Sequence, residues 1–396
     1  MTILDKIQIK PLVANKTPAE TTVVVAMSGG VDSSVCTALL HKLGYNVIGI
    51  TLQLWDYTPA SQAVEGEAKK FGTCCALDDV YDARRVCQTI GVPHYVLNYE
   101  SEFKSAVVDD FVETYLAGAT PIPCVRCNQR IKFDSFMDKA KGLGADVLVT
   151  GHYIRKDYDQ NGKAILRRGL DPKKDQSYFL FTTTQEQLEF SDFPLGQLTK
   201  EETRDLAKEL GLHVASKKDS QDICFVPGGD YRKVVRKHAP HAVKGGNFVD
   251  EDGQVLGRHD GILGFTVGQR KGLGGGFSKP MYVVEIRPEA REVVLGPKES
   301  LSKTTFTVKE VDWIDNTIEM DNLEVDTQVR YAHQGAPSTL KDLGDGRLEV
   351  TMHAPAYQIS PGQAAVFYVD DRMVGGGWIE VPEASKLNQK VRVKIA

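Results

Sequence analysis

A glycine-rich loop set between a buried strand and an amphipathic helix constrains this chain most. The apolar, β-branched run at residues 21–27 is typical of a strand buried on both faces. Apolar side chains then recur on one face of residues 32–43, and Gly44 can end that helix. Because strands buried on both faces belong to sheets covered by helices, this unit predicts an α/β fold with a parallel sheet. The loop itself reads Ser28-Gly29-Gly30-Val31-Asp32-Ser33-Ser34.

The same alternation of strands and helices continues to about residue 215, which predicts a doubly wound, Rossmann-like sheet. Beyond it the chain is rich in Lys, Gly and His, and then short strands separated by turns favour a small antiparallel β-barrel. The expected parts are a polar leader at 1–20, an α/β domain at 21–215, a small basic domain at 216–280 and the barrel at 281–396. Expected strands in the first domain are 46–52, 94–97 and 146–150, and expected helices are 79–90, 102–117 and 199–211.

Two local signals are strong enough to stand alone. Asn161-Gly162 between two short polar strands predicts a β-hairpin. Thr199 and Glu202 have the spacing of a capping box, so a helix is expected to start at Thr199.

Length and composition exclude several classes of protein. The 396 residues suit two or three domains, and 41% hydrophobic with 26% charged residues is typical of a folded chain rather than a disordered one. No apolar run reaches the roughly 18 residues of a membrane span, and residues 1–20 lack the pattern of a secretory signal. We therefore expect a cytoplasmic protein with no membrane partner.

The net charge of −5 averages over unlike regions. Residues 226–303 hold 13 Lys and Arg against 9 Asp and Glu, whereas the segments on either side are acidic. A second basic group, Arg167, Arg168, Lys173 and Lys174, follows the expected hairpin. Local positive charge of this kind is compatible with a nucleic acid partner despite the negative total.

The chemistry of the glycine-rich loop is that of an anion cradle. Two glycines permit a tight turn, serine hydroxyls can donate hydrogen bonds, and the helix N-terminus is positive. The loop lacks the Gly-Lys-Ser/Thr of a Walker A motif and the glycine spacing of a dinucleotide fingerprint. Asp32 would lie near a bound phosphate, which suits a bridging Mg²⁺. The loop resembles the PP-loop of the N-type ATP pyrophosphatase superfamily, whose members cleave ATP to AMP and pyrophosphate and so adenylate a carbonyl oxygen.

Seven is an odd number of cysteines, and a chain of this size does not need disulfides to be stable, so a disulfide framework is not expected. Cys124 and Cys127 follow Pro121 and Pro123, and Cys127 lies near an expected helix N-terminus beside arginines, where a thiolate is favoured. Cys224 stands in a polar segment and offers a second reactive thiol. Cys36 and Cys87 fall on apolar helix faces and are expected to be buried. Cys74 and Cys75 could instead complete a zinc site with Cys124 and Cys127.

With these residues in view, the chain from about residue 22 onward resembles the tRNA-specific 2-thiouridylases of the MnmA family. The resemblance covers the PP-loop, Thr150-Gly151-His152-Tyr153, residues 174–180, 218–225 and 268–274, Arg330-Tyr331 and residues 361–364.

The resemblance implies adenylation of the C2 carbonyl of the wobble uridine of tRNA, followed by sulfur transfer from a persulfide on Cys224, with Cys127 as the nucleophile. It implies ATP with Mg²⁺, tRNAs such as those for Lys, Glu and Gln, and a cysteine desulfurase or sulfur-relay protein as donor. ATP would be held by Ala26, Met27, Ser28, Gly29, Gly30, Val31, Asp32, Ser33, Leu52 and Gly151. The tRNA would contact His152, Lys174, Asp175, Gln176, Arg330, Tyr331 and Gln363, and its target base Ile122, Pro123 and Cys124.

One departure from the family pattern leaves the sulfur chemistry open. Many members carry Asp where this chain has Cys124, and that carboxylate is a proposed general base. Three thiols, Cys124, Cys127 and Cys224, are the ligand type for a [4Fe-4S] cluster with one open iron, which is an alternative route to the same thiolation. A PP-loop amide synthetase, which would need neither Cys127 nor Cys224, is the alternative from another enzyme class.

Overall fold

The computed structural model describes residues 10–55, 77–219, 223–240, 244–274, 276–314 and 322–381. Its chain divides into two units. The first holds residues up to 108 together with Pro123–Asp230 and Asp371–Val374. The second holds Asp109–Ile122, Tyr231–Asp370 and the chain from Gly375 onward.

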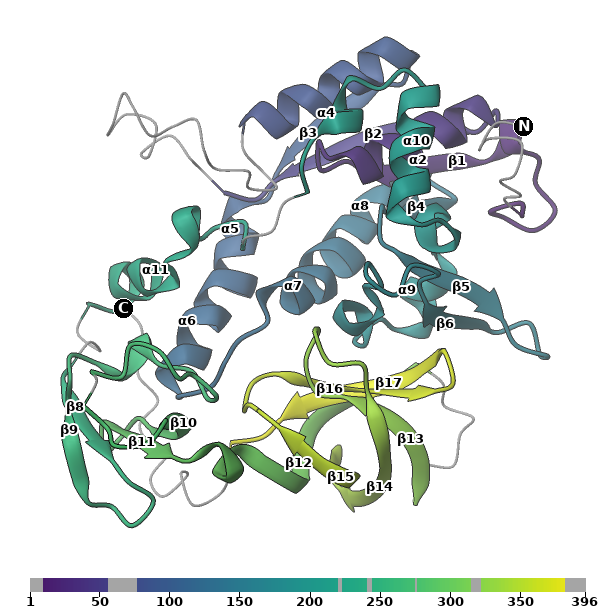
Figure 1. Ribbon diagram of the computed structural model, residues 1–396. Helices are drawn as coiled ribbons and strands as arrows, with labels where there is room; N and C mark the ends of the chain where they lie inside the picture. Colours follow the sequence, from purple (N-terminus) through teal and green to yellow (C-terminus); the bar gives the residue numbers. More distant parts are fainter. Residues whose placement is uncertain are drawn as a thin grey trace, which may run out of the picture. The chain divides into compact units, whose positions relative to one another are not determined.

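A parallel sheet forms the centre of the first unit (Figure 1). Its strand order is β3-β2-β1-β4-β7, and each neighbouring pair of strands is parallel. The strand order runs in opposite directions on the two sides of β1, as in doubly wound sheets, so the predicted fold class is confirmed. The strands are β1 (Thr22–Ala26), β2 (Asn46–Gln53), β3 (His94–Asn98), β4 (Val147–Val149) and β7 (Ser191–Asp192).

Helices follow these strands as the sequence pattern predicts, with two departures. The helix expected at 102–117 is three segments, α5 (Glu100–Phe103), a π-helix at Lys104–Val108 and α6 (Asp109–Leu116). The helix expected after Pro123 is likewise interrupted by a π-helix, Cys127–Ser135, between α7 (Pro123–Arg126) and α8 (Phe136–Gly142). Apolar spacing over so short a segment predicts a helix but does not identify which of its turns has i→i+5 hydrogen bonds. Of these segments, α6 belongs to the second unit. The other helices of the first unit are α2 (Val31–Lys42), α4 (Leu77–Ile90), α9 (Gln185–Glu189) and α10 (Lys200–Glu209).

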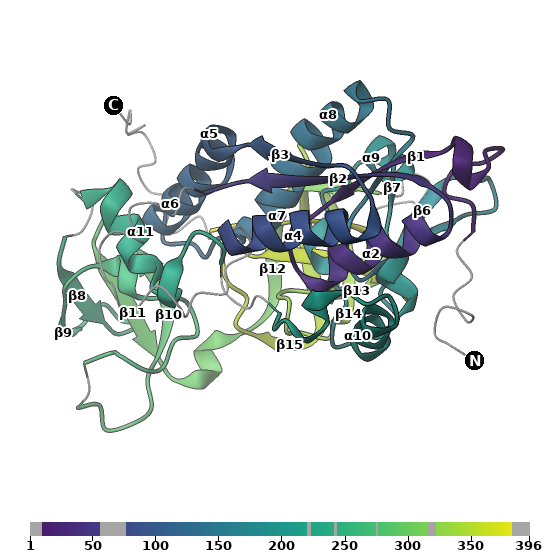
Figure 2. The same ribbon diagram turned by 90° about the horizontal axis from the view of Figure 1, so that it is seen from above.

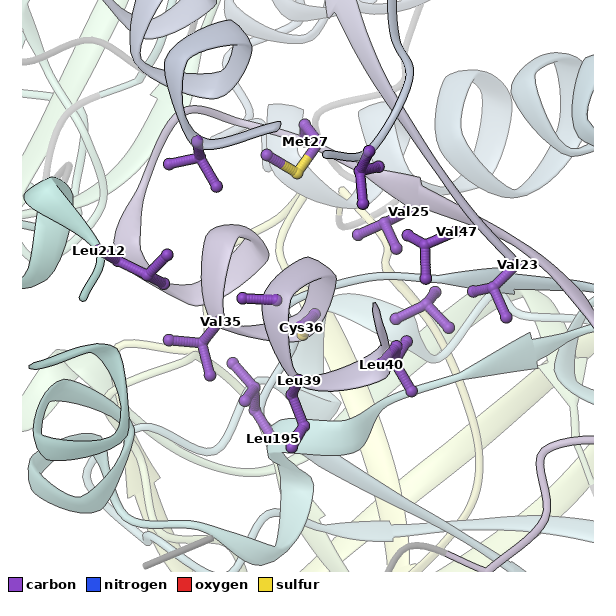
Figure 3. Close-up of a cluster of buried hydrophobic side chains, with 14 of the residues drawn as sticks. Val23, Val25, Met27, Val35, Cys36, Leu39, Leu40, Val47, Leu195 and Leu212 are labelled. Atoms are coloured by element: carbon purple, nitrogen blue, oxygen red, sulfur yellow. The ribbon is translucent and has the colours of Figure 1, made fainter. Parts of the chain in front are cut away.

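The core of the first unit lies between the sheet and α2 (Figure 3). Val35 and Leu39 of α2 are at most 1% exposed and belong to one cluster with Val23 and Val25 of β1, which are fully buried. Leu12 belongs to the same cluster, so the described part of the predicted leader includes a core residue. This packing fixes the first turn of α2, and with it the glycine-rich loop, against the end of β1.

Both local predictions are confirmed. β5 (Ile154–Tyr158) and β6 (Ala164–Arg168) pair antiparallel around the Asn-Gly turn, where Gly162 has a positive φ of 77°. Thr199 accepts a hydrogen bond from the Glu202 amide, and the Glu202 carboxylate accepts one from the Thr199 amide.

The second unit contains two sheets. Six strands close into an antiparallel barrel through the pairing of β12 with β17, as predicted for this part of the chain. They are β12 (Ser302–Trp313), β15 (Arg347–Tyr357), β14 (Ala336–Gly344), β13 (Leu323–Gln328), β16 (Ala364–Val369) and β17 (Arg372–Ile379).

The smaller sheet has the order β10-β11-β8-β9, and α11 (Tyr231–His238) belongs to the same unit (Figure 2). Its strands are β8 (Gly246–Val249), β9 (Val255–His259), β10 (Tyr282–Arg287) and β11 (Glu292–Gly296). Two of them, β8 and β9, lie where sequence patterns gave few regular elements. None of the helices in the described ranges is both long and apolar enough to span a bilayer.

Candidate functional site

The glycine-rich loop lies at the carboxyl edge of the parallel sheet, where ligands of such sheets bind. It joins β1 to α2, and its backbone turns at Gly29, whose φ is +70°. The Ser28 amide donates to Ser33 Oγ at 3.1 Å, and the two serine hydroxyls are 3.2 Å apart. These bonds close the loop around the N-terminus of α2, a site that favours anions.

Two neighbouring segments approach this loop too closely for any side chain. A Cβ on Gly29 would lie 2.1 Å from the carbonyl oxygen of Asp79 in α4. A Cβ on Gly151, just after β4, would lie 2.9 Å from the Ser33 amide nitrogen. The structure therefore brings Gly151 to the loop, as expected. Leu52 of β2, 8% exposed, lies near the carboxyl end of the neighbouring strand.

The Asp32 carboxylate is held by two groups that sequence reasoning missed. Lys200 Nζ lies 2.7 and 2.8 Å from its two oxygens, and the Tyr153 hydroxyl donates to one of them at 2.8 Å. The ammonium of Lys200 is also 5.6 Å from the centre of the Tyr153 ring. Burial, followed by the charge of Asp32, raises the pKa of Tyr153, so its hydroxyl stays protonated and keeps donating.

A strap at residues 217–219 crosses from the loop to α10. Lys217 Nζ donates to the Gly29 carbonyl at 3.0 Å and forms ion pairs with Asp79 and Asp82 of α4. Asp219 forms ion pairs with Lys174, Lys200 and Arg204 at 2.7, 2.9 and 2.8 Å. Partial burial alone would raise the pKa of Asp219, but Lys174 and Lys200 outweigh it and lower that pKa to about 2.

The three candidate thiols belong to the first unit and differ in exposure. Cys124 is exposed, Cys127 is 8% exposed and Cys224 is intermediate. Cys127 is the first residue of the π-helix after α7, a kind of element frequent at functional sites. The residue after Cys224, Phe225, is 1% exposed and packs against Trp55 and Phe103 with ring centres 6.0 and 5.6 Å away.

The remaining cysteines divide as follows. Cys36 and Cys87 are fully buried, as expected, and burial raises the pKa of Cys87 to about 11. Cys74 and Cys75, named for the zinc hypothesis, lie outside the described residues. Within the described ranges, no three His, Cys, Asp or Glu side chains are grouped so that they could hold a metal ion.

The residues predicted to contact tRNA in the first unit already have partners inside the chain. Asp175 accepts hydrogen bonds from the Gly169 amide and the Ser177 hydroxyl, and its carboxylate pairs with Arg168. The Gln176 side chain accepts from the Tyr153 amide at 2.9 Å. The Lys174 side chain, 38% exposed, pairs with Asp219.

His152 is the remaining residue of the first unit that is predicted to contact tRNA. Its side chain is hydrogen-bonded to the Thr150 hydroxyl at 2.7 Å, and burial, followed by the charge of Lys132, lowers its pKa well below the usual range. A neutral imidazole at this position can accept or donate a hydrogen bond but carries no charge for a phosphate.

Three of the four cations in the basic group predicted after the hairpin form ion pairs within the chain. Arg167 pairs with Asp371 and Asp157, and Arg168 pairs with Asp175. Asp371 is some two hundred residues away in the chain, so this pairing could not be seen in the local sequence.

In the second unit, Gln363 donates from its side chain to the Thr120 carbonyl at 3.0 Å, and the Thr120 amide donates to Pro361. These bonds fasten the segment that leads to Ile122, which is 8% exposed. Pro123, the next residue, is also buried. The Arg330 guanidinium donates to the Gln358 side chain, and Tyr331 is 44% exposed.

Comparison with known proteins identifies the family. Models of three domain families match in succession: "tRNA methyl transferase HUP domain" at residues 21–228, "tRNA methyl transferase PRC-barrel domain" at 232–297 and "Aminomethyltransferase beta-barrel domain" at 303–379. The domain borders that the sequence predicts, at residues 215 and 280, remain a prediction.

Similar curated proteins share one name, tRNA-specific 2-thiouridylase MnmA. The protein of Rhodospirillum centenum is 52% identical over 94% of each chain, and that of Paracoccus denitrificans is 51% identical over 92% of each. The protein of Rickettsia massiliae is 49% identical over 91% of this chain and 97% of its own. Identity at this level over nearly the whole length, together with the loop at the end of β1, shows that this chain belongs to the MnmA family of tRNA-specific 2-thiouridylases.

Proposed function

We propose that this protein is a tRNA-uridine 2-sulfurtransferase, which replaces the C2 oxygen of the wobble uridine by sulfur at the expense of ATP. The anion cradle at the start of α2 carries the proposal, because adenylation requires a triphosphate to be held there. The name that the relatives share supplies the substrate, and the cytoplasm, where we expect tRNA to be modified, is the proposed location.

The chain's own groups suit the nucleotide. The backbone from Ala26 to Ser33 would hold the phosphates, and Leu52 and Gly151 would flank the rest of ATP. Gly151 must lack a side chain there, since a Cβ would press on the amide of Ser33. Mg²⁺, when bound, would neutralise the triphosphate, and Asp32 has the oxygen ligands it prefers. In the described structure both Asp32 oxygens are held by Lys200.

The proposed chemistry proceeds in two steps. The C2 oxygen of the uridine attacks the α-phosphate of ATP, and pyrophosphate leaves. The terminal sulfur of a persulfide on Cys224 then attacks C2, and AMP carries the original oxygen away. Cys127 attacks the Cys224 sulfur, the sulfur–sulfur bond breaks toward the product, and a Cys127–Cys224 disulfide remains for a thiol to reduce.

The tRNA contacts are proposed on the same basis. Arg330, Tyr331 and Gln363 in the second unit and His152, Lys174, Asp175 and Gln176 in the first would contact the tRNA. Ile122, Pro123 and Cys124 would contact the target base. Since Asp175 and Gln176 already have partners inside the chain, we expect the Lys174 side chain, which is 38% exposed, to make the main contact of these three.

The test supplies ATP, a cysteine desulfurase with cysteine as the source of persulfide sulfur, and unmodified tRNA for Lys, Glu or Gln, and measures 2-thiouridine, AMP and pyrophosphate. We expect product with wild type, and none with Cys127→Ala or Cys224→Ala. Cys87→Ala, which removes a buried thiol, is the matched control and should retain activity. Thiolation that survives in either of the first two variants would refute the thiol mechanism. ATP cleavage with ammonia and no thiolation would instead indicate the amide synthetase.

The iron–sulfur alternative can be separated in the same experiment. Cys124, Cys127 and Cys224 are suitable ligand types, but the described residues show no metal-holding group among them, so no step is assigned to a cluster. A cluster predicts bound iron after anaerobic purification and loss of thiolation in Cys124→Ala. The persulfide route predicts active, iron-free protein. The sulfur donor, a cysteine desulfurase or relay protein, would be identified by which of these proteins supports thiolation.

A further inference from the structure

Lys200 lies at the meeting point of the phosphate loop and the strap. It is the first residue of α10, and its side chain is only 11% exposed. Its ammonium contacts both oxygens of Asp32 on one side and lies 2.9 Å from Asp219 on the other. One buried positive charge therefore joins two carboxylates, and without it these two negative charges would repel each other across the same space.

Asp219 is in turn one of two fixed points on either side of Cys224. Lys174 and Arg204 hold Asp219 together with Lys200. On the other side, Phe225 is anchored among the rings of Trp55 and Phe103. Residues 220–222 lie outside the described part of the chain. Asp219 and Phe225 are thus both held, five residues before and one residue after Cys224.

We propose that Lys200 is a positioning residue that couples the phosphate loop to the sulfur-carrying segment by holding Asp219 against Asp32. The inference rests on the proposed function in one respect, namely that Cys224 carries the sulfur. Lys200 acts on Cys224 through Asp219. Loss of its charge leaves Asp32 and Asp219 facing each other, which weakens the hold on Asp219, five residues before Cys224, while Lys174 and Arg204 still bind it.

The direct test is the rate at which a small alkylating reagent modifies Cys224 in native protein, measured by mass spectrometry with the exposed Cys124 as internal reference. Losing one of three charge-assisted hydrogen bonds to Asp219 should raise that rate about tenfold in Lys200→Met. Lys200→Arg should restore the wild-type rate. Lys208→Met, a 67% exposed position on the same helix, is the matched control and should change nothing.

Asp219→Asn provides a second variant that leaves the Lys200–Asp32 pair in place. It should raise the Cys224 rate as Lys200→Met does, so the proposal stays testable if Lys200→Met fails to fold, which labelling of buried Cys36 and Cys87 would reveal. Unchanged Cys224 rates in folded Lys200→Met or in Asp219→Asn would overturn the proposal, as would an equal rise in Lys208→Met.

A second readout separates coupling from a general loss of structure. In the thiolation assay, Lys200→Met should form less 2-thiouridine for each pyrophosphate released, because an adenylated uridine that meets no sulfur reacts with water and gives back uridine and AMP, and Lys200→Arg should recover the ratio. An unchanged ratio would contradict coupling. Because alkylation needs neither ATP nor tRNA, a wild-type protein that failed to thiolate would refute the proposed function and leave the labelling result to decide the role of Lys200.

Discussion

Replacing Gly29 by alanine tests whether the glycine-rich loop packs against α4 as described. The residue has φ +70°, where an L side chain costs about 1 kcal/mol or more. Its new Cβ would also lie 2.1 Å from the Asp79 carbonyl oxygen and 2.6 Å from the carbonyl carbon. Both atoms belong to backbone, so the loop or α4 must move, and overpacking of this kind costs about 1 to 3 kcal/mol. We expect Gly29→Ala to destabilise the first unit by about 2 to 4 kcal/mol.

Gly91 supplies the matched control. Its φ is +80°, but a Cβ there meets no atom within 4 Å, so Gly91→Ala carries only the backbone cost. For a unit of this size, about 1 kcal/mol lowers the melting temperature by about 2 to 4 °C. The melting temperature should thus fall by about 4 to 16 °C in Gly29→Ala and by about 2 to 4 °C in Gly91→Ala. A non-hydrolysable ATP analogue should raise the melting temperature of Gly91→Ala but not of Gly29→Ala. Equal melting temperatures for the two variants would refute the close approach of Asp79 to the loop.

Three further outcomes follow from the charges and burial of the site. Lys217→Met should lower the free energy of unfolding by about 2 kcal/mol, because Asp79 and Asp82 lose their shared cation, whereas Lys217→Arg should retain most of it; denaturant titration measures both, and an unaffected Lys217→Met would contradict the ion pairs. Asp219 has a folded-state pKa of about 2 against 3.8, so its contribution, about 1 kcal/mol once solvent screening is allowed for, is present above pH 4 and is lost as the pH falls toward 2; the stability difference between wild type and Asp219→Asn should shrink over that window, and a constant difference would be inconsistent with it. Cys36 and Cys87 are fully buried with raised pKa values, so native alkylation should reach Cys124 long before either; early modification of Cys87 would show that the core opens.

Local sequence signals predicted the parts of the site that depend on neighbours in the chain. The loop at Ser28–Ser34 follows a buried strand and precedes a helix, and the structure places it at the carboxyl edge of the parallel sheet. The hairpin at Asn161-Gly162 and the capping box at Thr199 formed as expected. Which residues contact ATP and tRNA stays a prediction, since it depends on ligands and not on the chain alone.

Interactions between distant residues were beyond sequence reasoning. Nothing near Lys200 in the sequence shows that its ammonium meets Asp32, 168 residues earlier, or that Lys217 reaches back to Gly29. Three of the four cations in the predicted basic group at 167–174 form ion pairs with carboxylates that local sequence could not identify as partners, for the same reason. Charge pairing is a property of three-dimensional neighbours, so a count along the chain overestimates the charge that a phosphate would meet.

The amino-acid sequence by itself determined the order of the strands and helices, the phosphate loop and the cysteines that could carry sulfur, because periodicity, turn residues and motif spacing are local. Only the tertiary structure decided that the first turn of α2, Gly151 and the strap at 217–219 meet, and that Lys200 stands between Asp32 and Asp219. Parallel sheets bring the ends of distant strands to one edge, so the residues that meet there come from separate parts of the chain. Which charged side chains form ion pairs there therefore depends on the fold and not on their order in the sequence.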